Sequence, residues 1–273
     1  MRVKVLVENT SVSSTYKSKH GLCLYIQTEK HKILFDLGSN KLFLENAKKM
    51  GINIGDIDIV VISHGHVDHA GALAIFLEHN SSAKIYIRES AFDKHYNKIF
   101  GLPFSVGIDS SLRSNKQIIF TDSIEVIDDE LTLFSDVQSN ELTSSSNIAL
   151  LAEINGKKQR DDFKHEQNLL IKEGGKVVLF AGCAHAGIVN IKARAKQLEN
   201  KNPLKIIGGF HLYNPISKKH ESKELVDKIV EQLNDGETCY YTCHCTGKWA
   251  YSIMKEKLKD NLEHLSTGKE IEI

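Results

Sequence analysis

The architecture expected of this chain follows from one segment, Val60-Val61-Ile62-Ser63-His64-Gly65-His66-Val67-Asp68-His69-Ala70-Gly71. It starts inside an apolar run rich in β-branched residues, from Ile57 to Ile62, which predicts a buried strand. Four side chains that can bind metals follow this strand within six positions. A surface loop that is rich in histidine by chance is the weaker interpretation, because such a dense pattern directly after an apolar strand is uncommon.

The four side chains fall into two pairs. His64 and His66 are two residues apart, so in an extended loop they project to the same side and can hold one ion. Asp68 and His69 follow where the chain turns toward a helix, and they can hold a second ion beside the first. The segment therefore predicts a metal site that can hold up to two divalent ions.

This segment, with the Ala70-Gly71 that follows it, resembles the signature of the metallo-β-lactamase superfamily. The resemblance implies an α/β fold of the αββα type, in which two mixed β-sheets are flanked by helices. It implies one domain over residues 1–273. It also implies one or two metal ions, with zinc as the expected metal and manganese or iron as alternatives. The superfamily hosts many chemistries, so the motif indicates mechanism better than substrate.

Composition narrows the class of partner. The 273 residues include 35 basic and 35 acidic side chains, and a net charge of zero argues against a nucleic-acid binder. The N-terminal residues lack the apolar core of a signal peptide, and no stretch is long enough to span a membrane. We therefore expect a cytoplasmic protein that binds a small molecule, with no membrane partner and with a homodimer as an open alternative.

Strands and helices alternate along the chain. Apolar runs with turn residues between them predict strands and amphipathic helices in alternation, and the metal-binding loop lies at the carboxyl end of a central strand. The expected strands cover residues 4–7, 22–28, 32–36, 57–62, 84–87, 118–126, 131–135, 149–154, 169–172, 176–181, 203–207, 238–243 and 269–273, and the expected helices cover 41–50, 72–78, 188–198, 221–233 and 248–258.

Residues 88–117 interrupt this alternation. Their periodicity is weak, and they carry glycines, a proline and scattered aromatic residues, which is typical of a loop-rich insertion. We interpret the insertion as a lid over the site, with Tyr96, Phe100 and Phe104 as an apolar inner face for a substrate ring. The alternative is that these aromatic residues only anchor the insertion to the body of the protein.

Three later strands also end at histidines, His185, His211 and His244. Each alone would more often be structural, but equivalent strand ends converge in open α/β sheets. We therefore predict two ligand groups and place His211 beside them, as a substitute ligand or as a hydrogen-bond donor to the substrate. The first metal is assigned to His64, His66 and His185, and the second to Asp68, His69 and His244.

In one position the chain departs from the usual superfamily pattern. Most members have a metal-bridging aspartate after a strand and a glycine, and this chain has Cys183 there. A thiolate can bind zinc, so Cys183 is an alternative ligand. The superfamily's other histidine usually lies upstream, where this chain has His165, so His165 and His185 compete for one position. We prefer His185 because it ends a strand in a segment of small residues.

Supporting roles are also expected. Asp36 ends a strand next to a glycine, and in the superfamily a similar carboxylate lies beneath the metal loop, so we expect it to orient a ligating histidine. The alternative for Asp36 is a helix cap. Cys239, Cys243 and Cys245 crowd one segment, which admits a redox role, but their spacing fits neither zinc fingers nor iron–sulfur proteins. Three buried thiols along a strand are the simpler interpretation.

Four motifs in order, Ser63 to Gly71, Gly182 to Ile191, Gly208 to Leu212 and His244 to Gly247, resemble a subgroup named after a dihydropterin ribofuranosylaminobenzene phosphate synthase. We expect a metal-dependent hydrolase that uses a metal-activated hydroxide on an ester-type, phosphorylated small molecule. Asp68 is the expected proton acceptor, and His211, Thr246 and Gly247 the expected substrate-binding residues. The alternatives are a synthase-like transferase and a metal-containing sensor or binding protein without turnover.

Overall fold

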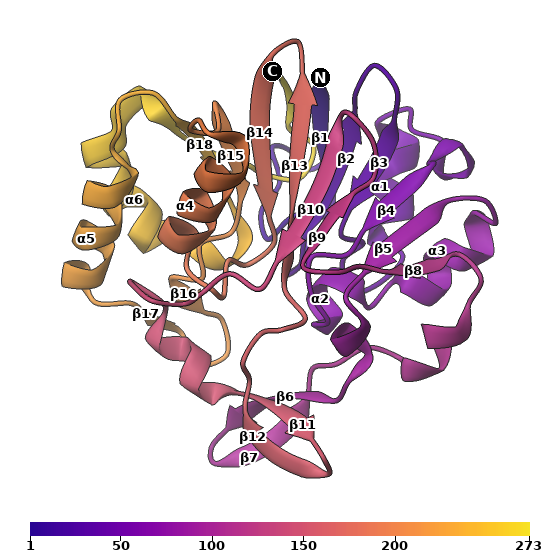
Figure 1. The fold of residues 1–273 in the computed structure, drawn as a ribbon, viewed down its shortest axis with the longest axis horizontal. Coiled ribbons are helices and arrows are strands. Elements are labelled where there is room, and N and C mark those ends of the chain that lie inside the picture. Colours follow the sequence, from indigo (N-terminus) through magenta and orange to yellow (C-terminus); the bar gives the residue numbers. More distant parts are fainter.

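Two seven-stranded β-sheets lie face to face at the centre of the computed structural model, which describes residues 1–273 (Figure 1). The first sheet has the order β20-β1-β2-β3-β4-β5-β8. Strands β3, β4, β5 and β8 are parallel, whereas β1, β2 and β20 are antiparallel to their neighbours. The bounds are β1 Arg2–Val7, β2 Cys23–Gln27, β3 Lys32–Phe35, β4 Ile59–Val61, β5 Lys84–Ile87, β8 Ile118–Phe120 and β20 Glu270–Glu272.

The second sheet has the order β19-β18-β15-β14-β13-β10-β9, and its strands β14, β15, β18 and β19 are parallel. Parallel strands point their carboxyl ends to one edge of a sheet. In both sheets this edge is the lower one in Figure 1. The bounds are β9 Ile124–Val126, β10 Leu131–Ser135, β13 Gln167–Glu173, β14 Lys176–Ala181, β15 Lys205–Gly208, β18 Cys239–Thr242 and β19 Leu262–His264.

Helices cover the outer face of each sheet. Helices α1 and α3 lie on the first sheet, and α4, α5 and α6 lie on the second (Figure 1). The short helix α2 contains half of the metal-binding segment and lies at the lower edge. The bounds are α1 Leu42–Lys49, α2 Val67–Ala70, α3 Leu73–His79, α4 Ile188–Glu199, α5 Lys223–Leu233 and α6 Lys248–Leu258.

The four layers enclose three apolar clusters, one at each interface. Side chains alternate along a strand, so a strand between two layers is apolar on both faces. In β14, Val178 and Phe180 pack between the sheets, whereas Val177 and Leu179 pack against the helices. The αββα sandwich predicted from the sequence is confirmed.

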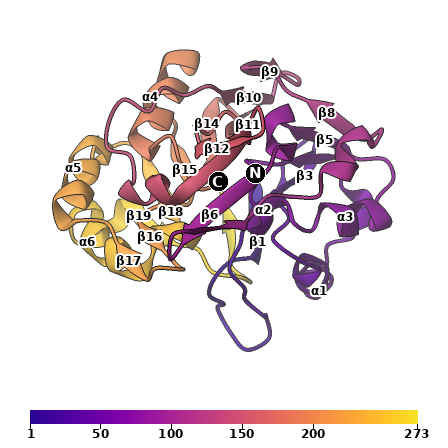
Figure 2. The same ribbon diagram turned by 90° about the horizontal axis from the view of Figure 1, so that it is seen from below.

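A small third sheet crosses the lower edge, where the two large sheets meet (Figure 2). Its order is β12-β11-β6-β7, so a hairpin of the predicted insertion pairs with a hairpin that lies some fifty positions later in the chain. The bounds are β6 His95–Ile99, β7 Leu102–Ser105, β11 Leu150–Ile154 and β12 Lys157–Arg160. A short ribbon, β16 Tyr213–Asn214 and β17 Lys219–His220, lies beside it.

Two sequence-based expectations need correction. Residues 118–126 are not one strand, because the chain leaves the first sheet after β8 and enters the second at β9. The aromatic residues of the insertion also do not form an inner face. Phe100 is fully exposed and Phe104 is half exposed, and the hydroxyl of Tyr96 donates to Glu153 of the neighbouring strand. None of the helices is long and apolar enough to cross a membrane.

Candidate metal centre

The loops that follow β4, β14, β15 and β18 meet at the lower edge of the sandwich and bring the predicted histidines together. The ring centroids of His64 and His66 are 4.6 Å apart, and the ring of His185 lies 4.9 Å from the first and 5.1 Å from the second. All three rings are buried, with side chains no more than 6% exposed. Segments from both sheets therefore build one histidine cluster.

Each of these three rings has a buried nitrogen without a partner. The Nε2 atoms of His64, His66 and His185 are inaccessible to solvent and make no hydrogen bond. The other nitrogen of His64 faces Ser63 Oγ at 2.9 Å, and that of His185 faces Asn147 Oδ1 at 3.2 Å. An Nδ1–H that donates to such a partner leaves the Nε2 lone pair free. Buried nitrogens of this kind are suited to bind a metal.

Asp68, His69 and His244 form a second group. His69 Nε2 and His244 Nε2 are only 3.1 Å apart, and Asp68 Oδ2 lies 3.7 Å from the former and 3.3 Å from the latter. His69 Nδ1 donates to Asp36 Oδ2 at 2.6 Å, and His244 Nδ1 donates to Asn9 Oδ1 at 3.1 Å. When both rings are neutral, the two Nε2 atoms face each other with lone pairs, an arrangement that a cation between them stabilises.

Asp36 supports both groups. Its carboxylate is completely buried and bonds directly to His69. It also accepts the backbone N–H and the hydroxyl of Ser63, both at 2.7 Å, and that hydroxyl in turn contacts His64 Nδ1. One carboxylate thus fixes the orientation of a ring in each group, which is the geometry expected of a residue that orients metal ligands.

Cys183 lies between the two groups. Its Sγ is 3.1 Å from His69 Nε2, and it lies within 4.8 Å of ligand atoms of His64 and His185. The side chain is 4% exposed. A thiolate in this position can contact ions in both groups, as the bridging carboxylate does in the pattern from which this chain departs.

His165 and His185 differ in how their ring nitrogens are used. His165 Nδ1 accepts the backbone N–H of Gly65 at 2.9 Å, and its Nε2 donates to Asp161 Oδ2 at 3.2 Å. Neither nitrogen is free. His185 keeps a free Nε2, and Glu166 holds its loop by accepting the backbone N–H of His185 at 2.6 Å. Of these two histidines, the geometry favours His185 as a ligand.

The predicted substrate-binding residues lie in different surroundings. Both ring nitrogens of His211 are unpartnered, and its ring is 4.3 Å from that of His185. The hydroxyl of Thr246 accepts the backbone N–H of Phe210 at 2.9 Å and contacts Thr242 Oγ1, so it is used inside the fold. Gly247 lies in the wall of a neighbouring cavity.

Burial and charge act differently on the two groups. Burial and the neighbouring histidines lower the pKa values of His64 and His185 well below the ordinary value, which keeps these rings neutral. Burial also opposes the charged form of His69, but Asp36 and Asp68 outweigh it and raise its pKa to about 9. The carboxylates therefore create a negative potential at the second group, which favours a cation there.

Two cavities open beside the cluster. The first, of about 220 Å³, reaches His66, Asp68, Cys183, His185, His211 and His244, and its outer wall includes Asn97 and Val106 from the insertion and Leu150 from β11. Side chains of the insertion therefore line this cavity, but they are not the aromatic residues that were predicted. The second cavity shares Tyr213 and His244 with the first and is lined by Lys218, His220, Gly247 and Lys248.

Sequence reasoning missed several side chains at the centre. His20 Nε2 is 3.1 Å from Asp68 Oδ2, and Asn9 and Asn147 orient two of the ring nitrogens. None of them belongs to a motif. The only signal for His20 is its place at the end of a polar, serine-rich loop, and the two asparagines carry none.

The three crowded cysteines separate in space. Cys239 Sγ donates to Asn261 at 3.8 Å, Cys243 packs between the sheets, and Cys245 lines the first cavity, where its sulfur accepts the backbone N–H of His211 at 3.2 Å. All five cysteines are free. The three do not form a cluster that could hold a cofactor.

A comparison with known families agrees with the fold and the site. Residues 19–138 match the family model of the metallo-beta-lactamase superfamily, a range that includes β4 and the segment from His64 to His69. The chain is therefore similar to this superfamily, in sequence over residues 19–138 and in fold over its whole length.

Particular relatives are similar over nearly the whole chain. One from Methanocaldococcus jannaschii, named 7,8-dihydropterin-6-methyl-4-(beta-D-ribofuranosyl)-aminobenzene-5'-phosphate synthase, is 27% identical and covers 98% of this chain and 95% of its own length. An uncharacterized protein of the same organism is 25% identical over 90% of each chain. The crystal structure of a metal-dependent hydrolase of the beta-lactamase superfamily matches with a TM-score of 0.85 and 29% identity, over 100% of this chain and 99% of that one.

Proposed function

We propose that this protein is a metal-dependent hydrolase that acts on an ester-type, phosphorylated small molecule. One observation carries the proposal. Histidines from separate loops turn one nitrogen to a neighbouring side chain and the other toward a common buried centre. Such an arrangement costs free energy unless an ion occupies the centre, because buried polar atoms without a partner are unfavourable.

The donor atoms fit divalent ions. His64, His66 and His185 would hold one ion, and Asp68, His69 and His244 would hold the other, with Cys183 between them. Imidazole, carboxylate and thiolate together favour zinc, with manganese or iron as alternatives. When bound, such ions act as Lewis acids and make water a nucleophile at neutral pH.

The side chains around the centre have separate roles in proton transfer, substrate binding and the exclusion of water. Asp68 lines the first cavity, where its carboxylate can accept a proton from attacking water, and His20 Nε2 lies 3.1 Å from Asp68 Oδ2. His211 offers two free ring nitrogens beside His185, so it can donate a hydrogen bond to the substrate. Val67, Val106 and Leu150 give the cavity an apolar wall that limits access of bulk water.

The second cavity supports a phosphorylated substrate. Its lining carries two lysines, Lys218 and Lys248, against one carboxylate, Glu8, and His244 and Tyr213 connect it to the first cavity. A substrate with its reacting bond in the first cavity can thus extend a phosphate into the second, where lysine ammonium groups bind it as point charges. The small-molecule partner, the cytoplasmic location and a homodimer stay predictions.

The test begins with metal analysis of the purified protein, which should contain one to two zinc, manganese or iron ions per chain. With the metal restored, the protein should cleave a model phosphodiester or carboxylic ester, and His66→Ala should lower kcat/KM by at least ~100-fold. His79→Ala, at an exposed position on α3, serves as the control. Unchanged turnover in metal-replete His66→Ala would reject the proposal.

A synthase-like transferase is the second candidate, because the similarity to the synthase-named relative spans 98% of the chain. Both reactions would use the same two cavities, so the products distinguish them. A transferase joins two substrates and forms a carbon–nitrogen or carbon–carbon bond, whereas a hydrolase incorporates oxygen from water. Incubation in ¹⁸O-labelled water followed by mass spectrometry separates the two, and a metal-loaded protein without any turnover would indicate a sensor.

A further inference from the structure

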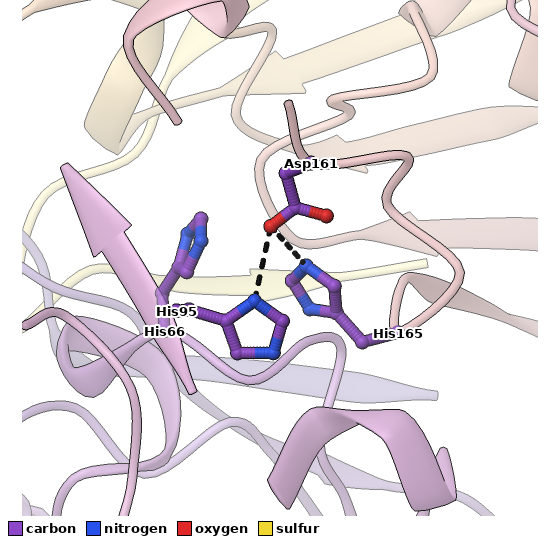
Figure 3. A group of neighbouring side chains, drawn as sticks. All are labelled: His66, His95, Asp161 and His165. Carbon is purple, nitrogen blue, oxygen red and sulfur yellow. Dashed lines mark hydrogen bonds and ion pairs between the residues drawn. The ribbon is translucent and has the colours of Figure 1, made fainter. Parts of the chain in front are cut away.

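A second buried cluster adjoins the metal centre on the side of the third sheet. It consists of His66, His95, Asp161 and His165, each of which has a potential ligand atom within 4.8 Å of those of the other three (Figure 3). His95 lies on β6, and Asp161 and His165 lie between β12 and β13. Each of the four residues is at most 6% exposed. Only His66 belongs to the proposed ligand set, so the other three need an explanation.

Hydrogen bonds inside the cluster use every ring nitrogen of His95 and His165. Asp161 Oδ2 lies 3.0 Å from His95 Nδ1 and 3.2 Å from His165 Nε2 (Figure 3). His95 Nε2 donates to the carbonyl of Ser90 at 3.1 Å, and His165 Nδ1 accepts the N–H of Gly65. Because His165 Nδ1 is an acceptor, its proton lies on Nε2 and points at the carboxylate.

The acceptor bond of His165 reaches the peptide between the two metal-binding histidines. Gly65 links His64 to His66, and its N–H to His165 Nδ1 is 2.9 Å long. Two residues after His165, the N–H of Gln167 donates to the carbonyl of Ser63 at 2.8 Å. The segment from His165 to Gln167 therefore holds the metal loop through two hydrogen bonds, one to Gly65 and one to Ser63.

The opposite side of the same peptide is equally confined. A Cβ atom at Gly65 would lie 2.3 Å from the carbonyl oxygen of Ala91, so no side chain fits there. The Gly65 peptide thus lies between Ala91 and His165, and it cannot rotate without breaking the bond to His165. Because this peptide fixes the direction of the two neighbouring side chains, its position sets where His64 Nε2 and His66 Nε2 point.

We propose that His165 is a positioning residue for the metal loop, and that Asp161 and His95 hold it in the tautomer that accepts the Gly65 N–H. This inference rests on the proposed metal centre. It assigns His165 a role through Gly65 rather than through an ion. Outer residues that orient ligands typically change metal affinity by ~10- to 100-fold when they are removed.

The experiment measures zinc affinity by competition with a chromophoric chelator, together with the number of ions bound at saturation. His165→Ala should weaken zinc binding by ~10- to 100-fold but leave the number of ions unchanged. His165→Asn places an amide oxygen near the position of Nδ1, so it should recover much of the affinity. His185→Ala, which removes a proposed ligand, should lose an ion at saturation.

A second measurement needs no variant. In wild-type protein loaded with ¹¹³Cd, long-range NMR spectra of the histidine rings should show coupling between cadmium and His185 but none to His165, whose proton should lie on Nε2. Cadmium coupling to His165, or loss of an ion in His165→Ala, would make it a ligand and overturn the inference. So would wild-type affinity in His165→Ala. A wild-type protein that binds no zinc would overturn the proposed function and this inference with it.

Discussion

At the scale of single residues, ligand competence depends on what the second ring nitrogen of a histidine touches. His64, His69, His185 and His244 each direct Nδ1 to a neighbouring oxygen atom, which leaves Nε2 for the centre. His165 is equally buried but has no free nitrogen. Burial alone therefore does not identify a ligand, and the hydrogen-bond partner does.

Asp36 gives the sharpest prediction at this scale. In Asp36→Asn one oxygen remains for the Ser63 N–H, but the amide group cannot accept the proton of His69 Nδ1. We expect zinc affinity to fall by ~10- to 100-fold, as for other residues that orient metal ligands. Chelator competition measures the effect. Asp129→Asn, which alters an exposed carboxylate paired with Lys30, should bind zinc like the wild type. Equal affinity in the two variants would contradict the role given to Asp36.

At the scale of elements, a buried lysine on helix α4 connects several parts of the second half of the sandwich. Helix α4 carries Lys192, a lysine that is only 7% exposed. Its ammonium group lies 2.7 Å from Asp235, 2.8 Å from the hydroxyl of Tyr240 on β18, and 3.2 Å from the carbonyl of Leu233 at the end of α5. This one side chain contacts the end of a second helix and a strand. Because its ammonium group is buried, it needs a counter-ion, which is Asp235.

Asp235→Asn should therefore destabilise the protein by about 1 to 3 kcal/mol, because it leaves a buried ammonium group without a charged partner. Burial opposes the charge of Asp235, but Lys192 and backbone N–H groups outweigh it and lower its pKa. A lowered carboxyl pKa stabilises the fold above the unfolded value of ~3.9, and this contribution is lost as the pH falls further.

Urea denaturation at several pH values checks both parts of this prediction. The difference in unfolding free energy between wild type and Asp235→Asn should be largest near neutral pH and should shrink below about pH 4. Glu224→Gln removes an exposed pair with Lys228 on α5 and should change stability by less than about 0.5 kcal/mol. If the difference in unfolding free energy between wild type and Asp235→Asn grew as the pH fell, the predicted direction of the pH dependence would be wrong.

The start of α6 and the short β16–β17 ribbon carry the prediction for substrate phosphate. Lys248 is the first residue of α6 and lines the second cavity with Lys218 from the ribbon. In Lys248→Ala, KM should rise for a phosphorylated ester but not for the same ester without phosphate, while kcat stays similar. Lys228→Ala on α5 is the matched control. An equal rise in KM for both esters would contradict the proposal that the substrate phosphate binds in the second cavity.

At the scale of the whole molecule, the proposed ligands come from both sheets. His64, His66 and His69 follow a strand of the first sheet, whereas Cys183, His185 and His244 follow strands of the second. Bound ions would therefore connect the two halves of the sandwich across their lower edge (Figure 1). Without ions, the unpartnered buried Nε2 atoms of His64, His66 and His185 weaken the same edge.

Removal of metal should consequently lower the melting temperature. Zinc at a concentration one hundred times its Kd stabilises a folded protein by about 2.7 kcal/mol, provided that it does not bind the unfolded chain. For a domain of this size that corresponds to roughly 5 to 10 °C. Thermal denaturation after chelation and again after zinc is restored measures the change, and the double variant His66→Ala, His185→Ala, which lacks two ligands of the first ion, should respond less than the wild type. An identical melting temperature in both states would argue against metal at this edge.

Much of the architecture could be predicted from sequence because it depends on local pattern. Alternating apolar residues and turn residues indicate the strands and helices, and the dense motif from His64 to His69 indicates the carboxyl end of β4. The third sheet could not be predicted. Residues 149–154 were expected as a strand and form β11, but no sequence pattern indicates that β11 pairs with β6, because the pairing uses backbone bonds. For the same reason the break between β8 and β9 is invisible in residues 118–126.

The sequence by itself indicated the resemblance to the superfamily, the layered fold and the set of metal-capable side chains at strand ends, since these follow from spacing and hydrophobic pattern. Only the tertiary structure decided how each side chain is used. His165 and His185 compete for one position along the chain, and only their contacts separate them: the partner of one is Gly65, one hundred positions away, and the partner of the other is Asn147. A ring nitrogen is free or occupied according to such distant contacts, and no local pattern encodes them.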